Sequence, residues 1–253
     1  MNHPKNKVLV IAHRGASGIA PENTLAAVKA AIEMGVDMVE LDVHQTRDDI
    51  AVVIHDKTVN RTSNGKGKVK DFTFDELQVL DSGSWFHPKF KNEKIPSLES
   101  VLQEVKGKVK LLIEVKETKY SGIEKNIVQL LNKYDAKNWC IIQAFETGVL
   151  NNIQKLDPSI EIHKLVVGDI PGLPLHIDNC LRTGNIYKYN NTASINPNFK
   201  FVNKKTIQKI HGQGQKINTW TVNEQGDMEK MIKMGVDGII TNYPDQLIKM
   251  LNN

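Results

Sequence analysis

The sequence contains few cysteines. Only two occur in 253 residues, Cys140 and Cys180, and two thiols cannot form a framework of disulfides. Neither belongs to a Cys-x-x-Cys pair or to a cysteine and histidine pattern with the spacing of a zinc site. We therefore expect a fold that depends on its hydrophobic core, without disulfides or structural zinc.

Long apolar segments and a strong charge imbalance are also missing. The apolar run from Val8 to Ala12 is too short for a membrane span or for the apolar region of a signal peptide. A net charge of +4, from 33 basic and 29 acidic side chains, is too small to indicate nucleic-acid binding. We expect a cytoplasmic protein without a membrane span or a nucleic-acid partner. Whether it forms a homo-oligomer stays open.

What the chain does contain is a regular alternation of two patterns, and its 253 residues suit one large α/β domain spanning residues 1–253. Short β-branched apolar runs predict strands at 7–12, 38–43, 51–54, 110–115, 139–143, 161–167, 193–196, 216–222 and 238–241. Helical periodicity predicts helices at 23–34, 97–105, 121–134, 147–155, 203–211, 224–234 and 244–251. Such alternation is typical of a largely parallel sheet.

The second and third predicted strands are too close together for a parallel crossover, so we expect a β-hairpin there. A turn centred on Asp48-Asp49 would place His55 opposite Asp42. With the returning strand set aside, eight strands remain, and the fold we expect is an irregular TIM (β/α)8 barrel with a hairpin extension. Segment 57–94 breaks the alternation, and we expect it to form a small insertion subdomain over the carboxyl-terminal face, with a short helix within 71–80.

Polar side chains stand where several of these strands end, which is where barrel enzymes place their active sites. They are His13, Arg14, Glu40, Asp42, His55, Asp56, Glu114 and Lys116. Because side chains alternate between the two faces of a strand, Glu40 and Asp42 share one face. Glu114 and Lys116 likewise share a face of the next parallel strand, so three carboxylates are expected around one volume.

Three carboxylates in a low-dielectric pocket repel one another, and a divalent cation would remove that conflict. Oxygen ligands such as Glu40, Asp42 and Glu114 suit Mg²⁺ or Ca²⁺. Arg14 and Lys116 beside them predict an anionic substrate, with phosphate fitting best.

Two histidines flank the same region. Imidazoles ordinarily titrate near neutrality, and a pair such as His13 and His55 can take a proton from a nucleophile and give one to a leaving alkoxide. With a cation and a bound phosphate, the pair predicts cleavage of a phosphodiester.

The sequence closely resembles the bacterial glycerophosphodiester phosphodiesterases in ordered motifs that span nearly the whole chain. These are His13-Arg14-Gly15, Pro21-Glu22-Asn23-Thr24, Glu40-Leu41-Asp42-Val43, Val53-Ile54-His55-Asp56, Asp81-Ser82-Gly83-Ser84-Trp85-Phe86, Ile95-Pro96-Ser97-Leu98, Ile113-Glu114-Val115-Lys116, Trp220-Thr221-Val222-Asn223 and Asp237 to Pro244. The resemblance implies hydrolysis of substrates such as glycerophosphocholine or glycerophosphoethanolamine to glycerol 3-phosphate and an alcohol.

The resemblance also implies a role for each candidate residue. His13 and His55 become the acid and base, Glu40, Asp42 and Glu114 ligate Mg²⁺ or Ca²⁺, Arg14 and Lys116 hold phosphate, Trp220 packs on the glycerol carbons, and Glu22 orients the groups that bind substrate. Attack by the substrate's own hydroxyl, giving a cyclic phosphate, and direct attack by water stay open. The family commonly has serine at the position of Ala144, which puts the preferred leaving group in question.

Three other functions deserve comparison. A metal-dependent lyase or aldolase would share the acidic cluster but would not need His55 opposite His13. A binding protein that had lost activity would lack a histidine or a metal ligand, whereas all of them are present. A phospholipase would need an exposed apolar entry surface, and segment 57–94 offers no clear one.

Overall fold

The structure is a computed structural model that describes residues 8–116, 122–169, 175–177, 181–183 and 186–252. Cys180 lies outside these ranges. So do the first residue of the strand predicted at 7–12 and the first residue of the helix predicted at 121–134. Cys140 is buried on a barrel strand.

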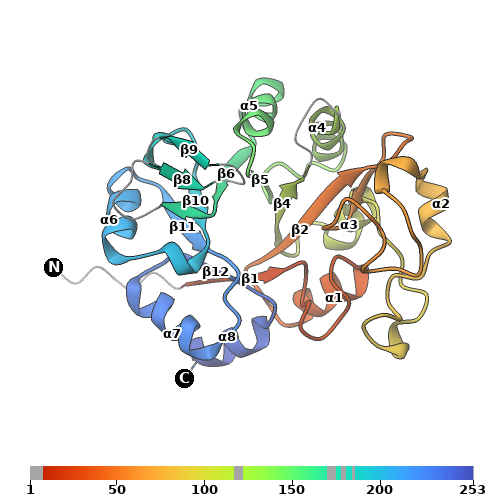
Figure 1. Cartoon of the computed structure of the whole chain (residues 1–253), viewed down its shortest axis with the longest axis horizontal. Helices are drawn as coiled ribbons and strands as arrows, with labels where there is room; N and C mark the ends of the chain where they lie inside the picture. The colour runs from red at the N-terminus through yellow and green to blue at the C-terminus, as the bar shows by residue number, and fades with distance from the viewer. Residues whose placement is uncertain (1–7, 117–121, 170–174, 178–180, 184–185, 253) are drawn as a thin grey trace.

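Parallel strands form a closed barrel, as predicted (Figure 1). They are β1 (Leu9–His13), β2 (Met38–Gln45), β4 (Lys110–Val115), β5 (Cys140–Ala144), β6 (Glu161–Val166), β10 (Ser194–Pro197), β11 (Lys216–Thr219) and β12 (Gly238–Thr241). The barrel closes because β1 pairs in parallel with both β12 and β2.

Helices surround the barrel (Figure 1). They are α1 (Leu25–Glu33), α3 (Leu98–Val105), α4 (Ile123–Lys133), α5 (Thr147–Leu156), α6 (Lys204–Gly212), α7 (Gln225–Met234) and α8 (Pro244–Asn252). Side-chain hydroxyl and amide oxygens cap several of them; Ser97, for example, accepts the N–H of Ser100 at the start of α3. The predicted helices therefore all form, with ends that shift by one or two residues.

Alternation along each strand separates two apolar cores. Val10 and Ala12 of β1 pack outwards in the large core between barrel and helices, whereas Ile11 packs inside the barrel with Leu112. Further along each strand, every second side chain keeps facing inwards. Where those positions are polar, the side chains consequently point into the barrel mouth.

The predicted hairpin forms, but its register was wrong by one residue. β3 (Ala51–Val53) pairs antiparallel with β2, and Val43 lies opposite Val53. The turn has three residues between Thr46 and Ile50 rather than two, and Asp49 adopts a left-handed φ of 64° to close it. His55 is therefore not directly opposite Asp42; instead, the N–H of Ile54 donates to the carbonyl of Asp42.

The insertion packs on the hairpin. Its helix α2 (Phe74–Gln78) lies inside the predicted range 71–80, with 3-10 turns at Val69–Asp71 and Pro88–Phe90. Val59 and Leu77 of the insertion bury against Val52 and Ile54, forming a small core separate from the barrel. Figure 1 shows α2 beyond the outer edge of the barrel, beside β2.

One element was not predicted. A three-stranded antiparallel sheet of β7 (Gly168–Asp169), β8 (Leu175–Ile177) and β9 (Leu181–Thr183) lies between β6 and β10 in the chain. Further 3-10 turns are at Ile186–Lys188 and Phe199–Phe201. Strands of two or three residues are too short to show an alternating pattern, which is why sequence periodicity missed them.

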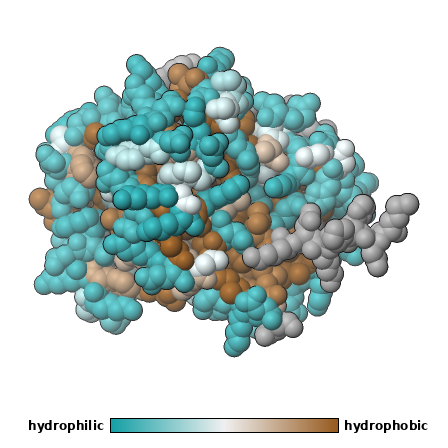
Figure 2. Space-filling model, turned by 180° about the vertical axis from the view of Figure 1, so that it is seen from behind, coloured by the Kyte–Doolittle hydropathy of each residue, from teal (hydrophilic) through white to brown (hydrophobic). Residues whose placement is uncertain are grey.

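Apolar side chains are concentrated inside the molecule. Seen from behind, the surface is mostly hydrophilic, with smaller hydrophobic areas between polar side chains (Figure 2). Among the described residues, no helix combines the length and the apolar character needed to cross a membrane.

The same four residues, Met-Gly-Val-Asp, precede β2 at 34–37 and β12 at 234–237. In both copies, glycine in a left-handed conformation follows the helix. Each aspartate then exchanges two hydrogen bonds with the preceding barrel strand: Asp37 with the backbone of Val10, and Asp237 with the backbone of Ile217. The carboxylates thus join neighbouring strands at the end of the barrel opposite the predicted site.

We predict that Asp237→Ala lowers the free energy of unfolding by about 1–2 kcal/mol, because the N–H of Ile217 loses its acceptor. Urea denaturation measures the change. Asp245→Ala, which removes an exposed carboxylate from the first turn of α8, should cost only a few tenths of a kcal/mol. Equal losses in the two variants would contradict the proposed role of Asp237.

Candidate active site

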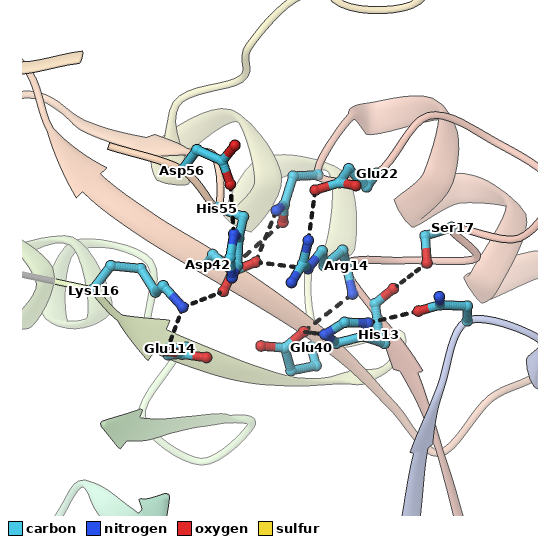
Figure 3. Close-up of polar contacts among 12 residues, drawn as sticks. His13, Arg14, Ser17, Glu22, Glu40, Asp42, His55, Asp56, Glu114 and Lys116 are labelled. Carbon is cyan, nitrogen blue, oxygen red and sulfur yellow. Dashed lines mark hydrogen bonds and ion pairs between the residues drawn. The ribbon is translucent and has the colours of Figure 1, made fainter. Parts of the chain in front are cut away.

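The predicted site residues meet at the carboxyl ends of β1, β2 and β4 (Figure 3). Strand register places His13 beside Glu40 and Asp42 beside Glu114. A cavity of about 320 Å³ opens there, and its lining includes His13, His55 and Glu114. The sequence therefore identified residues that the fold does bring together.

The carboxylates of Glu40, Asp42 and Glu114 are buried and offer oxygen atoms within 4.8 Å of one another. Burial and the neighbouring anions raise the pKa of Glu40 well above its usual range, and raise that of Glu114 to about 7. Asp42 behaves differently: although burial opposes ionisation, the cations of Lys116 and Arg14 hold its pKa at about 2. An all-oxygen set of this kind fits a divalent cation such as Mg²⁺ or Ca²⁺.

Two cations lie between these anions. Lys116 Nζ is 2.7 Å from Glu114 Oε1 and 3.5 Å from Asp42 Oδ1. Arg14 Nε is 3.3 Å from Asp42 Oδ2, and its backbone N–H donates to Glu40 at 3.1 Å. Burial disfavours both cations, but the surrounding carboxylates raise the pKa of each above its usual value, so both stay charged.

A tight backbone loop positions Arg14. Arg14 and Gly15 both adopt left-handed conformations, with φ of 57° and 79°. A Cβ atom on Gly15 would lie 2.6 Å from the backbone of Ala27 at the start of α1. Only glycine fits between the strand end and this helix, which explains why Gly15 follows His13 and Arg14 at the end of β1.

Each candidate histidine bonds a side-chain oxygen atom through its Nδ1 atom. His13 Nδ1 is 2.6 Å from Asn242 Oδ1, and His55 Nδ1 is 2.7 Å from Asp56 Oδ1. With an oxygen acceptor at Nδ1, the proton resides there and Nε2 is the atom left to exchange protons. Burial lowers the pKa of His13 to about 4 and also lowers that of His55, against the pull of Asp42.

One wall of the cavity is apolar. Trp220 and Phe145 form an edge-to-face pair with ring centroids 5.7 Å apart, beside Leu165 and Ile240. The Trp220 indole N–H donates to the carbonyl of Asn196 at 2.8 Å, which fixes the ring at the edge of the cavity. Glu22 does not line this cavity; its carboxylate accepts from Arg14 at 2.7 Å.

Sequence reasoning gave no role to three further residues in contact with the site. Asn242 binds His13 from within a motif already identified, whereas Gln143 binds Glu40 at 3.2 Å from the inner face of β5. Arg61 binds Glu22 and Asp56 from the insertion. The insertion has no periodicity, and so nothing in the sequence predicted which of its residues would reach the site.

Comparison with known proteins identifies the family of this chain. The chain matches the Glycerophosphoryl diester phosphodiesterase family over residues 13–246. It is 40% identical to the glycerophosphodiester phosphodiesterase of Caldanaerobacter subterraneus over 97% of this chain and 98% of that protein. It is 35% identical to the enzyme of the same name from Bacillus altitudinis, over 95% and 97% of the two chains.

Solved structures give the same result. A phosphodiesterase from Oleispira antarctica, solved in complex with the product sn-glycerol-3-phosphate, superposes with a TM-score of 0.85 at 26% identity over 97% of both chains. The chain belongs to the glycerophosphoryl diester phosphodiesterase family and, like its relatives of that name, is a phosphodiester hydrolase.

Proposed function

We propose that this enzyme uses a divalent cation, Mg²⁺ or Ca²⁺, to hydrolyse substrates such as glycerophosphocholine or glycerophosphoethanolamine. The products are glycerol 3-phosphate and an alcohol. One observation carries the proposal: three buried carboxylates and two partly buried cations share a cavity mouth with two histidines whose Nδ1 atoms are already bonded. The product bound to the Oleispira relative supports the glycerol 3-phosphate half of the substrate.

The residues proposed to hold the cation are Glu40, Asp42 and Glu114. When all three acids are ionised, as a bound cation would favour, they exceed Arg14 and Lys116 by one negative charge. A divalent ion is therefore electrostatically favoured even with both basic side chains in place. When bound, such an ion supplies charge stabilisation to phosphoryl oxygens and lowers the pKa of a coordinated hydroxyl.

Arg14 and Lys116 are the proposed phosphate ligands. Both line the cavity, and each side chain is 17% exposed, so their remaining donors face the cavity rather than bulk water. Arg offers a planar fork and Lys a point charge to the phosphate oxygens. Glu22 holds the Arg14 guanidinium from the side away from Asp42, which orients that fork.

His13 and His55 are proposed to transfer the two protons of the reaction through their Nε2 atoms. One removes the proton of the attacking hydroxyl, and the other protonates the oxygen of the departing alcohol. The same pair serves whether the nucleophile is water or the glycerol hydroxyl of the substrate. In the second route, a held hydroxyl has the high effective concentration of an intramolecular reactant, and water then opens the cyclic phosphate.

Trp220 and Phe145 are proposed to pack against the carbon atoms of the substrate, because they form the apolar wall of the cavity. Ala144, where the family commonly has serine, is buried in the core between the barrel and the helices and does not line this cavity. We also infer that residues 1–253 form one domain, since the insertion buries its apolar side chains against the hairpin of the barrel.

The first prediction concerns activity. Incubated with glycerophosphocholine and Mg²⁺ or Ca²⁺, the protein should release glycerol 3-phosphate, and chelation with EDTA should stop the release. Release of phosphocholine in its place, or full activity in excess EDTA, would contradict the proposal. Phosphorus NMR at early times separates the two routes, because only internal attack yields a cyclic phosphate.

The second prediction concerns the histidines. His13→Ala and His55→Ala should each lower kcat by about 10²–10⁴-fold, the usual contribution of a general acid or base. Circular dichroism checks that the fold is retained. His87→Ala removes an exposed histidine of the insertion and should leave kcat unchanged. Near-normal turnover in either active-site variant would exclude that histidine from proton transfer.

The third prediction concerns Glu114. Glu114→Gln removes one anionic ligand, so the cation concentration that gives half-maximal activity should rise by about tenfold or more. The cation should also raise the melting temperature of this variant less than that of the parent protein. Glu124→Gln is a matched control, because Glu124 is also 8% exposed but lies on α4 and binds Asn152. An unchanged cation titration in Glu114→Gln would count against its role as a ligand.

A further inference from the structure

Arg61 connects two carboxylates at the edge of the active site. Its NH1 and NH2 atoms donate to the two oxygens of Glu22, both at 2.8 Å. Its Nε and NH2 atoms donate to the two oxygens of Asp56 at 2.8 and 3.0 Å. One guanidinium therefore binds two carboxylates, each through a two-bond fork, which is the strongest geometry available to an arginine ion pair.

Each of these carboxylates has a second partner inside the site. Glu22 Oε1, which accepts from Arg61 NH2, also accepts from Arg14 NH1 at 2.7 Å. Asp56 Oδ1, which accepts from Arg61 NH2, also bonds His55 Nδ1 at 2.7 Å. An unbroken chain of charged hydrogen bonds thus runs from Arg14 through Arg61 to His55.

The chain joins segments that flank three different elements of the barrel. Arg14 follows β1, Glu22 precedes α1, and His55 and Asp56 follow the short strand β3. Arg61 belongs to the insertion, so the insertion contributes the one group that binds both Glu22 and Asp56 in the described part of the chain.

Charge explains why a cation is needed at this place. Glu22 and Asp56 would face each other as two anions without Arg61. In its presence both stay ionised: Arg61 is foremost in lowering the pKa of Asp56 and, with Arg14, lowers that of Glu22 against the effect of burial. An ionised Asp56 has no proton to donate, so in its contact with His55 it can only accept. The Nδ1 atom of His55 therefore carries the proton, which keeps Nε2 free for proton transfer.

A second arginine pair provides a contrast. Arg47 binds Glu76 of α2 with both side chains about half exposed, and Glu76 otherwise makes only the capping bonds of its own helix. Exposed pairs of that kind contribute little. Glu22, by comparison, is 14% exposed and passes its contact on to Arg14.

We propose that Arg61 is a positioning residue for the reaction, which holds Glu22 and Asp56 so that the Arg14 guanidinium and the His55 imidazole are oriented together. The proposal rests on the proposed function, since that assigns phosphate binding to Arg14 and proton transfer to His55. Arginine is required because lysine, with a single nitrogen atom, cannot form two planar forks at once.

The experiment compares Arg61→Met and Arg61→Lys with the parent enzyme. Both variants should lower kcat for glycerophosphocholine by about 10–100-fold, the usual cost of losing a residue that orients a reacting group. Arg14 also loses orientation, so KM should rise. In ¹⁵N NMR of the histidine rings, His55 should change from a single Nδ1–H tautomer to a mixture.

Arg47→Met is the matched control, and it should change neither kcat nor the His55 spectrum. Arg61→Lys keeps the charge, and melting temperatures of all variants identify any that fails to fold. Activity within twofold of the parent in both folded Arg61 variants, or an unchanged His55 spectrum, would overturn the proposal. The NMR result does not depend on turnover, so a parent enzyme inactive on glycerophosphodiesters would contradict the proposed function and leave the test of Arg61 intact.

Discussion

Repulsion among three buried carboxylates is the constraint on which the site depends. Glu40, Asp42 and Glu114 are buried, with carboxylate oxygens within 4.8 Å of one another, so bulk water screens their repulsion only weakly. Arg14 and Lys116 offset two of the three charges, and Asp42, which contacts both cations, is the acid most easily ionised. With all three acids ionised, one negative charge would remain, and this is the electrostatic basis for the divalent cation proposed at the barrel mouth.

A hydrogen-bonded ladder inside the barrel fixes one of these acids. Gln143 donates to Glu40 and accepts from Asn196 at 3.0 Å, and Asn196 in turn bonds Ser194 and Asn218. These amides and hydroxyls come from β5, β10 and β11 and are buried. A buried polar group costs stability unless it is bonded, so these hydrogen bonds favour one orientation of Glu40.

The loops around the barrel mouth complete the site from outside. Asn242 after β12 bonds His13, and Asn223 accepts the backbone N–H of Asn242 at 3.0 Å. On the other side of the mouth, the insertion reaches Glu22 and Asp56 through Arg61. Each histidine thus has its own support, from loops far apart in the sequence, which explains how a (β/α)8 scaffold can hold two imidazoles in fixed orientations at one barrel mouth.

The sequence by itself determined the strands, the helices and the inward-facing residues, because side-chain alternation is a local property of a strand. Glu40, Asp42 and Glu114 followed from that alternation, and the eight-strand count led to the barrel. Only the tertiary structure decided the three-residue hairpin turn at Asp49, the small sheet of β7 to β9, and the contacts of Gln143 and Arg61. Those features depend on backbone torsion and on which distant side chains come within about 3 Å, and neither leaves a periodic trace in the sequence.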